Sequence, residues 1–473
     1  MLSRRQLLDR TTYGVGTIAL AWLLNRERLL GEPAKPDLEP KHYDLKPKAP
    51  HFAPQAKAMI SLFMQGGPSH MDLLDPKPKL NELDGKPFPG TIKYDNAAQA
   101  SSKVLGSPWK FKKHGQSGID ASELLPNIAR IADDITVVRS MTNAVNNHVQ
   151  AIHAMNTGRI QSGHPVLGSW LCYGLGCQSQ ELPAFVALPD PISPPVSNVE
   201  HWANGWLPSI YQGTVIRSKE PRIANLDAPP GMKGQPQEKL LQYLGALNRE
   251  HLAAHPGEND LDARIASYEL AAKMQTAAKE AIDLSRESAK TKAMYGMDDP
   301  ASAEYGSRCL VARRLVERGV RFVQVFTSDQ AWDTHGGLRT ALPAVCRKTD
   351  KPAAALVKDL KARGLLESTI VSWGGEMGRL PVVQNEASAG RDHNTYGFTW
   401  WFAGGGFKGG TVYGATDEFG HHAVEHPVSH HDFHATLMHL FGLDAKKLTY
   451  SRTGPLLTIL AGEEGKVVKE LLR

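Results

Sequence analysis

Histidines and carboxylates recur in glycine-rich segments of the C-terminal third of the chain. Asp333 and His335 stand two residues apart in the first such segment, and Glu376 lies in the second. In the third, Asp392 directly precedes His393 and is expected to orient its ring. Imidazole and carboxylate are the usual protein ligands of a divalent cation, and neighbouring glycines let the backbone approach it closely. These residues therefore predict a metal site.

Each residue type also has a plainer interpretation. Asp333 could cap a helix that begins near Leu338, and His335 could simply be exposed. Glu376 could form an ion pair with Arg379. Arg379 could instead bind an anionic group, because a guanidinium matches phosphate and sulfate geometry. We favour ligation because these residues follow the ends of predicted strands, where open α/β sheets place their sites.

Further candidates stand upstream in the chain. Gln65, His70 and Asp72 follow the first predicted strand, although Asp72 could equally cap a turn. Asn147 and His148 precede a predicted helix. A histidine at a helix N-terminus is well placed to contact a metal or an anion.

Seven histidines crowd residues 421–439, and most are expected at the surface or in positions that support the metal ligands. His430 and His431, just before the last predicted helix, are retained as additional candidates.

The elements that must position these residues alternate between strand and helix. Short apolar runs predict strands over residues 58–64, 135–139, 184–188, 320–326, 369–373 and 398–403. Apolar periodicity predicts helices over 122–132, 149–156, 166–175, 302–318, 338–363 and 434–441, the fifth broken at Pro352. This alternation favours an α/β fold with a mostly parallel sheet and helices on both faces. Charge-rich helical segments near residues 240–300 predict an exposed helical insertion.

The N-terminus resembles an export signal over residues 1–31. Arg4 and Arg5 precede an apolar run at 14–24, a pattern typical of the twin-arginine type; the alternative is an ordinary amphipathic helix. We expect an exported protein, in the periplasm, the cell envelope or outside the cell. Its partners would include the twin-arginine export machinery, with membrane contact only through an uncleaved signal.

The remaining chain divides by composition. Residues 32–54 are rich in Pro and Lys and predict an extended linker; the folded domain is expected over 55–450, with a tail and helix at 451–473. The net charge of +5 is dispersed, without the basic stripe that nucleic-acid binding requires. Cys172 and Cys177 could form a local disulfide in an oxidising compartment or remain small buried apolar residues.

Together these segments resemble a bacterial family of twin-arginine-exported proteins, labelled domain of unknown function 1501, within the alkaline phosphatase/sulfatase-like superfamily. The motifs that carry the resemblance are Gln65–His70, Asn156–Arg159, Trp332–His335, Gly374–Glu376 and His434–Thr436. The resemblance covers nearly the whole chain. It implies a three-layer α/β/α sandwich with one or two metal ions at the strand ends, and cleavage of phosphate or sulfate esters.

The same resemblance assigns roles to particular residues. Asp333, His335 and His393 would hold one metal, and Glu376 would hold a second. Gln65 departs from the pattern, because a metal-binding Asp usually follows the first strand.

The nucleophile position departs from the family pattern as well. Thr157–Arg159 resembles the end of the sulfatase nucleophile motif, which places the nucleophile at His148 or Asn147. Sulfatases use Cys or Ser there, and phosphatases use Ser or Thr, to form a covalent intermediate.

Two functions therefore stay open. The first is a metal-dependent hydrolase of phosphate or sulfate esters, including esters on glycans, in which zinc, manganese or calcium activates water. His148 would act as base or ligand, and Arg379 would neutralise the oxyanion. The second is a non-catalytic relative that binds anionic glycans or cell-envelope components. A dinucleotide enzyme is disfavoured, because Gly404–Gly406 lacks the spacing of a phosphate-binding loop.

Overall fold

The computed structural model describes residues 42–94, 100–224, 226–228, 231–255, 257–451, 456–460 and 462–473. The predicted export signal, with its paired arginines and apolar run, lies outside these residues. Among the helices of the described part of the chain, none combines the length and the apolar character needed to cross a bilayer.

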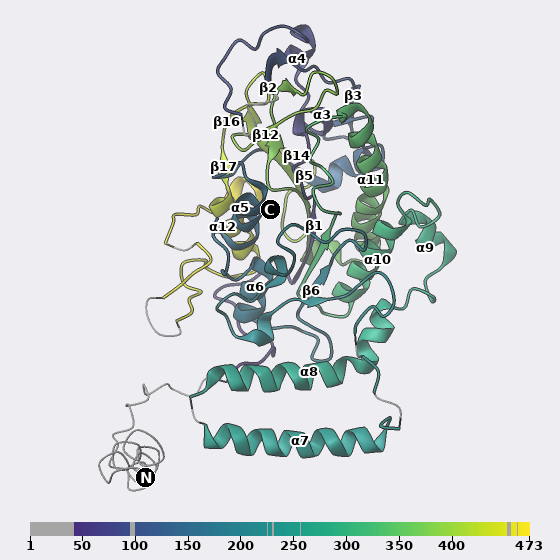
Figure 1. Cartoon of the computed structure of the whole chain (residues 1–473), viewed down its shortest axis with the longest axis vertical. Coiled ribbons are helices and arrows are strands. Elements are labelled where there is room, and N and C mark those ends of the chain that lie inside the picture. The colour runs from purple at the N-terminus through teal and green to yellow at the C-terminus, as the bar shows by residue number, and fades with distance from the viewer. Residues whose placement is uncertain are drawn as a thin grey trace, which may run out of the picture.

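A nine-stranded sheet forms the centre of the described structure (Figure 1). Its strand order is β14 (Thr411–Tyr413), β5 (Ile135–Thr142), β13 (Phe398–Ala403), β9 (Thr369–Gly374), β1 (Ala58–Phe63), β8 (Phe322–Phe326), β6 (Phe185–Leu188) and β7 (Thr214–Val215). The ninth strand, β17 (Val428–Ser429), pairs with β5. Every pairing is parallel except those of β13 with β5 and β9. The sheet is therefore mostly parallel, as predicted, and every strand but β13 ends at the same edge.

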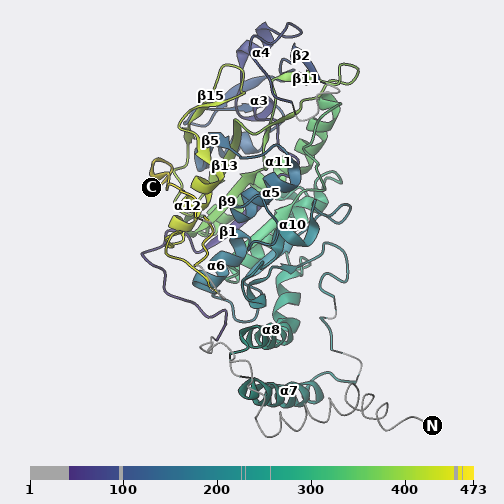
Figure 2. The same cartoon turned by 60° about the vertical axis from the view of Figure 1, so that its left-hand side comes forward.

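Helices cover both faces of the sheet, which gives the predicted three-layer α/β/α arrangement (Figures 1 and 2). One face carries α10 (Ala303–Glu317) and α11 (Leu338–Ala362); the other carries α5 (His148–Thr157), α6 (Leu167–Leu175) and α12 (His430–Leu440).

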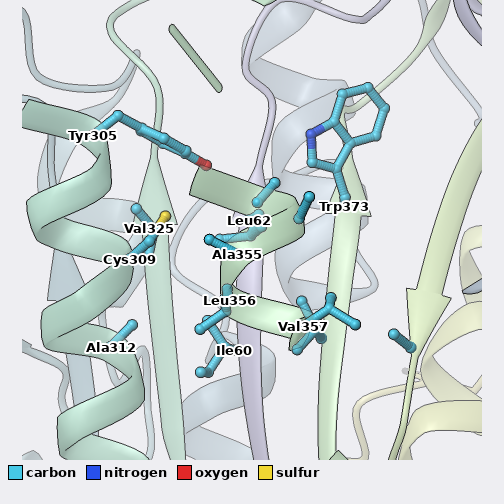
Figure 3. Packing of buried hydrophobic residues seen from close by; sticks show 14 of the residues in the cluster. Ile60, Leu62, Tyr305, Cys309, Ala312, Val325, Ala355, Leu356, Val357 and Trp373 are labelled. Carbon is cyan, nitrogen blue, oxygen red and sulfur yellow. The ribbon is translucent and has the colours of Figure 1, made fainter. Parts of the chain in front are cut away.

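Successive side chains of β1 point to opposite faces, so the strand is apolar on both. Ile60 and Leu62 join the core under α10 and α11, where Figure 3 shows them beside Leu356, whereas Met59 and Phe63 join the core under α5, α6 and α12. Burial of each such side chain contributes about 1.5–3 kcal/mol.

Smaller elements decorate this core. Four two-stranded sheets pair β10 (Gly378–Arg379) with β12 (His393–Asn394), β11 (Val382–Gln384) with β2 (Ala100–Val104), β15 (Ala415–Thr416) with β16 (Ala423–Glu425), and β3 (Phe111–His114) with β4 (Ile119–Ser122) in the described residues. Short helices are α3 (His70–Leu73), α4 (Pro78–Glu82) and α9 (Ala289–Met294), and the 3-10 helices include η2 (Ile128–Asp134) and η6 (Lys469–Leu471). Two long helices, α7 (Gln235–Ala254) and α8 (Asn259–Ile282), occupy the region predicted as a helical insertion.

The helix predicted over 122–132 is wrong in its first half. Ser122 ends strand β4, and helical turns begin only at Ile128 in η2. Pro126 explains the delay, because a proline disfavours helical backbone at the residue before it.

Two other helix boundaries also differ from the prediction. Helix α11 continues through Pro352 without a break. Its apolar face buries Leu342 and Leu356, and this packing outweighs one lost backbone hydrogen bond. Helix α12 begins at His430 rather than at residue 434, because Ser429 and Asp432 form a capping box there.

The described part of the predicted linker packs against the body. Tyr43 and Leu45 are buried, and the backbone N–H of His51 donates to the carbonyl of Gly442 at 2.9 Å. Apolar residues among the many prolines and lysines account for this difference. All four cysteines are buried and free, so no disulfide links Cys172 to Cys177.

Candidate metal centre

Four residues that the sequence analysis named as site candidates meet at the edge of the sheet where its parallel strands end. His148 begins α5 shortly after β5, and Asp333 and His335 lie in the loop after β8. His393 lies in β12, where it pairs with Arg379 just beyond the end of β9. One ligand atom from each of His148, Asp333, His335 and His393 lies within 4.8 Å of all the others. These four residues form the candidate metal centre.

The spacing of these atoms matches a coordination sphere. Nε2 of His335 lies 3.0 Å from Nε2 of His393 and 3.0 Å from Oδ1 of Asp333. Nε2 of His393 lies 3.3 Å from Oδ1 of Asp333, and Nε2 of His148 lies 3.3 Å from its Oδ2. Ligand atoms around a tetrahedral zinc ion are about 3.4 Å apart, given metal–ligand bonds of about 2.1 Å.

The other nitrogen of each ring is held by an acceptor outside the centre. Nδ1 of His393 lies 2.7 Å from the backbone oxygen of Asn146, so it must carry the ring hydrogen. Nδ1 of His335 contacts the side-chain oxygen of Gln384. Asp392, expected to orient the ring of His393, accepts the backbone N–H of His393 at 2.8 Å and lies 3.7 Å from Nδ1 of His335. These contacts leave both Nε2 lone pairs facing the centre, which is how proteins orient metal-binding histidines.

Glu376 holds His148 in the same way and lies outside the centre. Its Oε1 lies 2.7 Å from Nδ1 of His148, and its carboxylate accepts the N–H of Gly66 at 2.9 and 3.2 Å. The side chain is fully buried. Glu376, predicted to hold a second metal, therefore contacts a ligand instead, and no second cluster of ligand type forms within the described residues.

Arg379 forms an ion pair with Asp333. Its guanidinium is fully buried, and Nη1 lies 2.6 Å from Oδ1 of Asp333. The same group donates to the carbonyls of Gly66, Gly67 and Arg391. The predicted role in neutralising an oxyanion does not fit this placement, because the donors already have acceptors in the protein. Arg379 instead positions the carboxylate of Asp333.

The electrostatics of the centre reflect this crowding. Burial alone would raise the pKa of Asp333, but Arg379 and the surrounding histidines hold it well below its usual range. Burial lowers the pKa of His148, yet hydrogen bonds to Asp333 and Glu376 outweigh it and raise the pKa to about 9. His148 therefore carries a proton when no cation is present, and a bound cation would take that proton's place.

The sequence match that decides the family covers residues 56–472, and it is to the family described as Protein of unknown function (DUF1501). The chain belongs to this DUF1501 family. No curated protein matches the chain closely enough to count as a relative.

Three solved structures illustrate the similarity of fold. The PsFucS1 sulfatase from Pseudoalteromonas sp. has 13% identity and a TM-score of 0.34, over 82% of this chain and 68% of that one. A protein in the alkaline phosphatase superfamily from Vibrio parahaemolyticus has 12% identity and a TM-score of 0.35, over 88% of this chain and 72% of that one. Phosphonate monoester hydrolase SpPMH from Silicibacter pomeroyi has 9% identity and a TM-score of 0.36, over 88% of this chain and 76% of that one. At this distance, a function for the DUF1501 protein must be argued from its own site.

The upstream candidates that follow β1 lie beside the centre rather than in it. Asp72 is buried in an ion pair with Arg391, at 2.8 and 3.1 Å. Nε2 of His70 lies 2.7 Å from the carbonyl of Gly420. Gln65 is fully buried, and within the described structure its side-chain amide has no hydrogen-bond partner. A buried amide without a partner is costly, so Gln65 fits a position that contacts a bound group.

The remaining candidates fall into two kinds. Asn147 caps α5 by accepting the N–H of Gln150, and thereby fixes the start of the helix that presents His148. His430 and His431 lie elsewhere, because His431 contacts the carbonyl of Gly158 at the opposite end of α5. They do not join the centre.

Two supporting groups escaped prediction. The oxygen of Asn146 holds His393, and the side chain of Gln384 holds His335. The acceptor in Asn146 is its backbone oxygen. Every residue type has this atom, so the sequence gives no signal for it. Gln384 ends a short strand and carries no motif. The sequence pattern could therefore single out the candidate ligands but not these two groups that orient His393 and His335.

The donor set fits a divalent cation. It combines three imidazole nitrogens and one carboxylate, with ring orientations fixed from outside and atoms spaced for simultaneous ligation. Three nitrogen donors favour zinc or manganese over calcium, which prefers oxygen ligands throughout.

Proposed function

We propose that this protein is a metal-dependent hydrolase of phosphate or sulfate esters. One observation carries the proposal: three imidazoles and one carboxylate converge while the second nitrogen of each ring is held by an outside acceptor. A merely structural histidine needs one partner, not a common focus with three others. Such a convergence suits a bound cation.

A bound divalent cation would supply Lewis acidity, which polarises an ester oxygen and makes water a better nucleophile. The protein's own residues would prepare that chemistry. Glu376 fixes the ring of His148, and Arg379 fixes the carboxylate of Asp333. Fixed ligands need no reorganisation during the reaction, which is the main way in which active sites lower barriers.

Water is the proposed attacking group because His148 stands where the family resemblance expects a nucleophile. Its Nε2 faces Asp333 at 3.3 Å, so it is placed as a ligand rather than as a group that attacks an ester. If His148 is a metal ligand, a water molecule must be the group that attacks the ester. We propose esters on anionic glycans as substrates and an exported location, on the strength of the predicted N-terminal signal.

The test begins with metal content. The full chain, purified from its own host without chelators, is expected to hold at least one equivalent of zinc or manganese by elemental analysis. The Asp333→Ala/His335→Ala double variant should lose that metal while keeping its circular dichroism spectrum. His422→Ala, which changes an exposed histidine outside the centre, is the matched control.

Activity is then measured on a panel of aryl phosphates, aryl sulfates and sulfated oligosaccharides. Turnover by the wild type and its loss in the double variant support the hydrolase. Metal bound without any turnover would favour the non-catalytic, glycan-binding alternative. Full metal content in the double variant would refute the site itself.

A further inference from the structure

Helix α7 exposes an apolar face to solvent. Leu240, Tyr243, Leu244 and Leu247 have exposed fractions of 43, 62, 42 and 42%. No residue of α7 is buried, and in Figures 1 and 2 the helix is the outermost element, separated from the body by α8. A cluster of large apolar side chains on one exposed helix is unusual for a monomer and typically marks an interaction surface.

These side chains form a continuous stripe. At 3.6 residues per turn, Leu240, Leu244 and Leu247 lie on one side of the helix, with Tyr243 at its margin. Gln237 donates to Gln275 of α8 at 2.9 Å and so marks the side of α7 that faces α8; the less exposed Asn248 and Leu252 lie on that side. Leu244 lies at the edge of that side, whereas Leu240, Tyr243 and Leu247 lie farther round the helix from α8. We call the four residues Leu240, Tyr243, Leu244 and Leu247 the α7 stripe.

Charges beside the stripe indicate which partner fits it. Lys239 and Glu250 lie about three turns apart on the same flank, next to Tyr243. A two-fold axis near Leu244 runs a second α7 antiparallel to the first. This pairing places Lys239 of each copy beside Glu250 of the other, and Leu240 beside Leu247. The pattern is thus complementary to itself, as a two-fold interface requires.

We propose that the α7 stripe is a dimerisation surface and that its occupant is α7 of a second copy of this chain. The charges of α7 balance, because Lys239 and Arg249 offset Glu238 and Glu250. An anionic membrane surface would favour a basic helix instead. A helix of 20 residues is about 30 Å long, so one face offers about 300 Å² per copy against about 800 Å² in a stable complex. The dimer is therefore weak and depends on concentration.

Sedimentation velocity on the full chain, from about 1 to 200 µM, tests the proposal. The wild type is expected to shift from monomer to dimer across this range. Leu244→Glu/Leu247→Glu should remain monomeric throughout, because it buries charge at the centre of the interface. Val424→Glu, at a 59% exposed apolar residue of β16, is the control and should dimerise normally.

Charge reversal makes the test specific to self-pairing. Lys239→Glu and Glu250→Lys should each raise the dissociation constant roughly tenfold, because like charges then face each other. The variant with both changes should regain wild-type affinity, as should an equal mixture of the two single variants.

Four outcomes would overturn the proposal. They are a monomeric wild type at 200 µM, failure of the double reversal to restore pairing, loss of pairing on deletion of residues 1–31, and stripe-dependent sedimentation with phosphatidylcholine or phosphatidylglycerol vesicles. Loss of pairing on deletion would indicate that residues 1–31 are needed for it. Sedimentation with vesicles would indicate that the stripe binds a lipid surface.

Discussion

Two groups of histidines lie at opposite ends of helix α5, about 15 Å apart along its axis. At the first end, His148 meets His335, His393 and Asp333, and the Nε2 atoms of all three rings point inward. At the second end, His431 and His434 of α12 each contact a single backbone carbonyl of the α5 region, at 3.2 Å in both cases. Both groups are rich in the same residue, but only one has a common focus.

The difference between the groups lies in what holds each ring. In the candidate metal centre, the acceptors bind the outer ring nitrogens, and the Nε2 atoms converge. In the α12 group, the one hydrogen bond of His434 points into α5, and its Nδ1 has no hydrogen-bond partner in the described structure. A histidine count therefore cannot identify a site; the direction of the second ring nitrogen can.

The largest contrast is expected from loss of His148. His148→Ala removes one of four ligand groups, and we expect metal affinity to fall by more than about 100-fold, beyond the effect of losing a supporting group. Titration with a chromophoric chelator measures the affinity, and the melting temperature checks the fold. Equal affinity in wild type and variant would remove His148 from the centre.

A smaller effect is expected from Glu376→Gln. The amide keeps the shape and can still contact Gly66, but it no longer draws the Nδ1 hydrogen of His148 with a full charge. Groups of this kind change metal affinity by about 10–100-fold. Glu200→Gln is the matched control, because Glu200 contacts His153 at 2.6 Å outside the centre. An affinity loss greater than that of His148→Ala would indicate that Glu376 itself holds metal.

Much of the fold could be predicted because its signals are local. The runs at 58–64 and 369–373 are apolar on both faces of the sheet, as parallel strands must be, and both form the predicted strands. Boundaries were less accurate where packing or capping decides them. Helix α11 continues through Pro352 because the turns around it bury apolar side chains. Local sequence rules predict a break at a proline and do not include this packing.

The meeting of Asp333 and His335 with other candidate ligands could be predicted because they follow the end of β8, at the edge where parallel strands end; His393, in β12, is singled out by residue type beside Asp392. Their partners could not be predicted. Whether Glu376 binds a metal or a ligand depends on a separation of a few ångströms across loops distant in sequence. Arg379 follows the same logic: its residue type suits an anion, but its buried position directs it to backbone carbonyls and Asp333.

Two histidines of α12, His431 and His434, should affect stability at low pH rather than metal binding. Burial lowers the pKa of His434 to about 3, whereas an unfolded histidine titrates near 6.5. The unfolded chain therefore binds the extra proton first, and stability falls as the pH drops below about 6.5. At pH 5 the loss from this residue is about 2 kcal/mol.

Urea denaturation at pH 7.5, 6 and 5 measures this slope. His434→Gln should flatten the dependence even though it changes the core, whereas His422→Gln, at an exposed position, should leave it unaltered. An unchanged slope in His434→Gln would mean that other groups dominate the acid sensitivity.

The smallest effect is expected from His431→Ala, and it tests the comparison from its other side. His431 is half-buried, and its Nε2 has one hydrogen bond, to the carbonyl that ends α5 at Gly158. Loss of one such bond costs about 1 kcal/mol, and water can reach the freed carbonyl. Metal affinity should not change, since the ring lies a helix length from the centre. If the same chelator titration showed weaker binding in this variant, the two histidine groups would be coupled through α5, and the independence inferred from their separate contacts would be wrong.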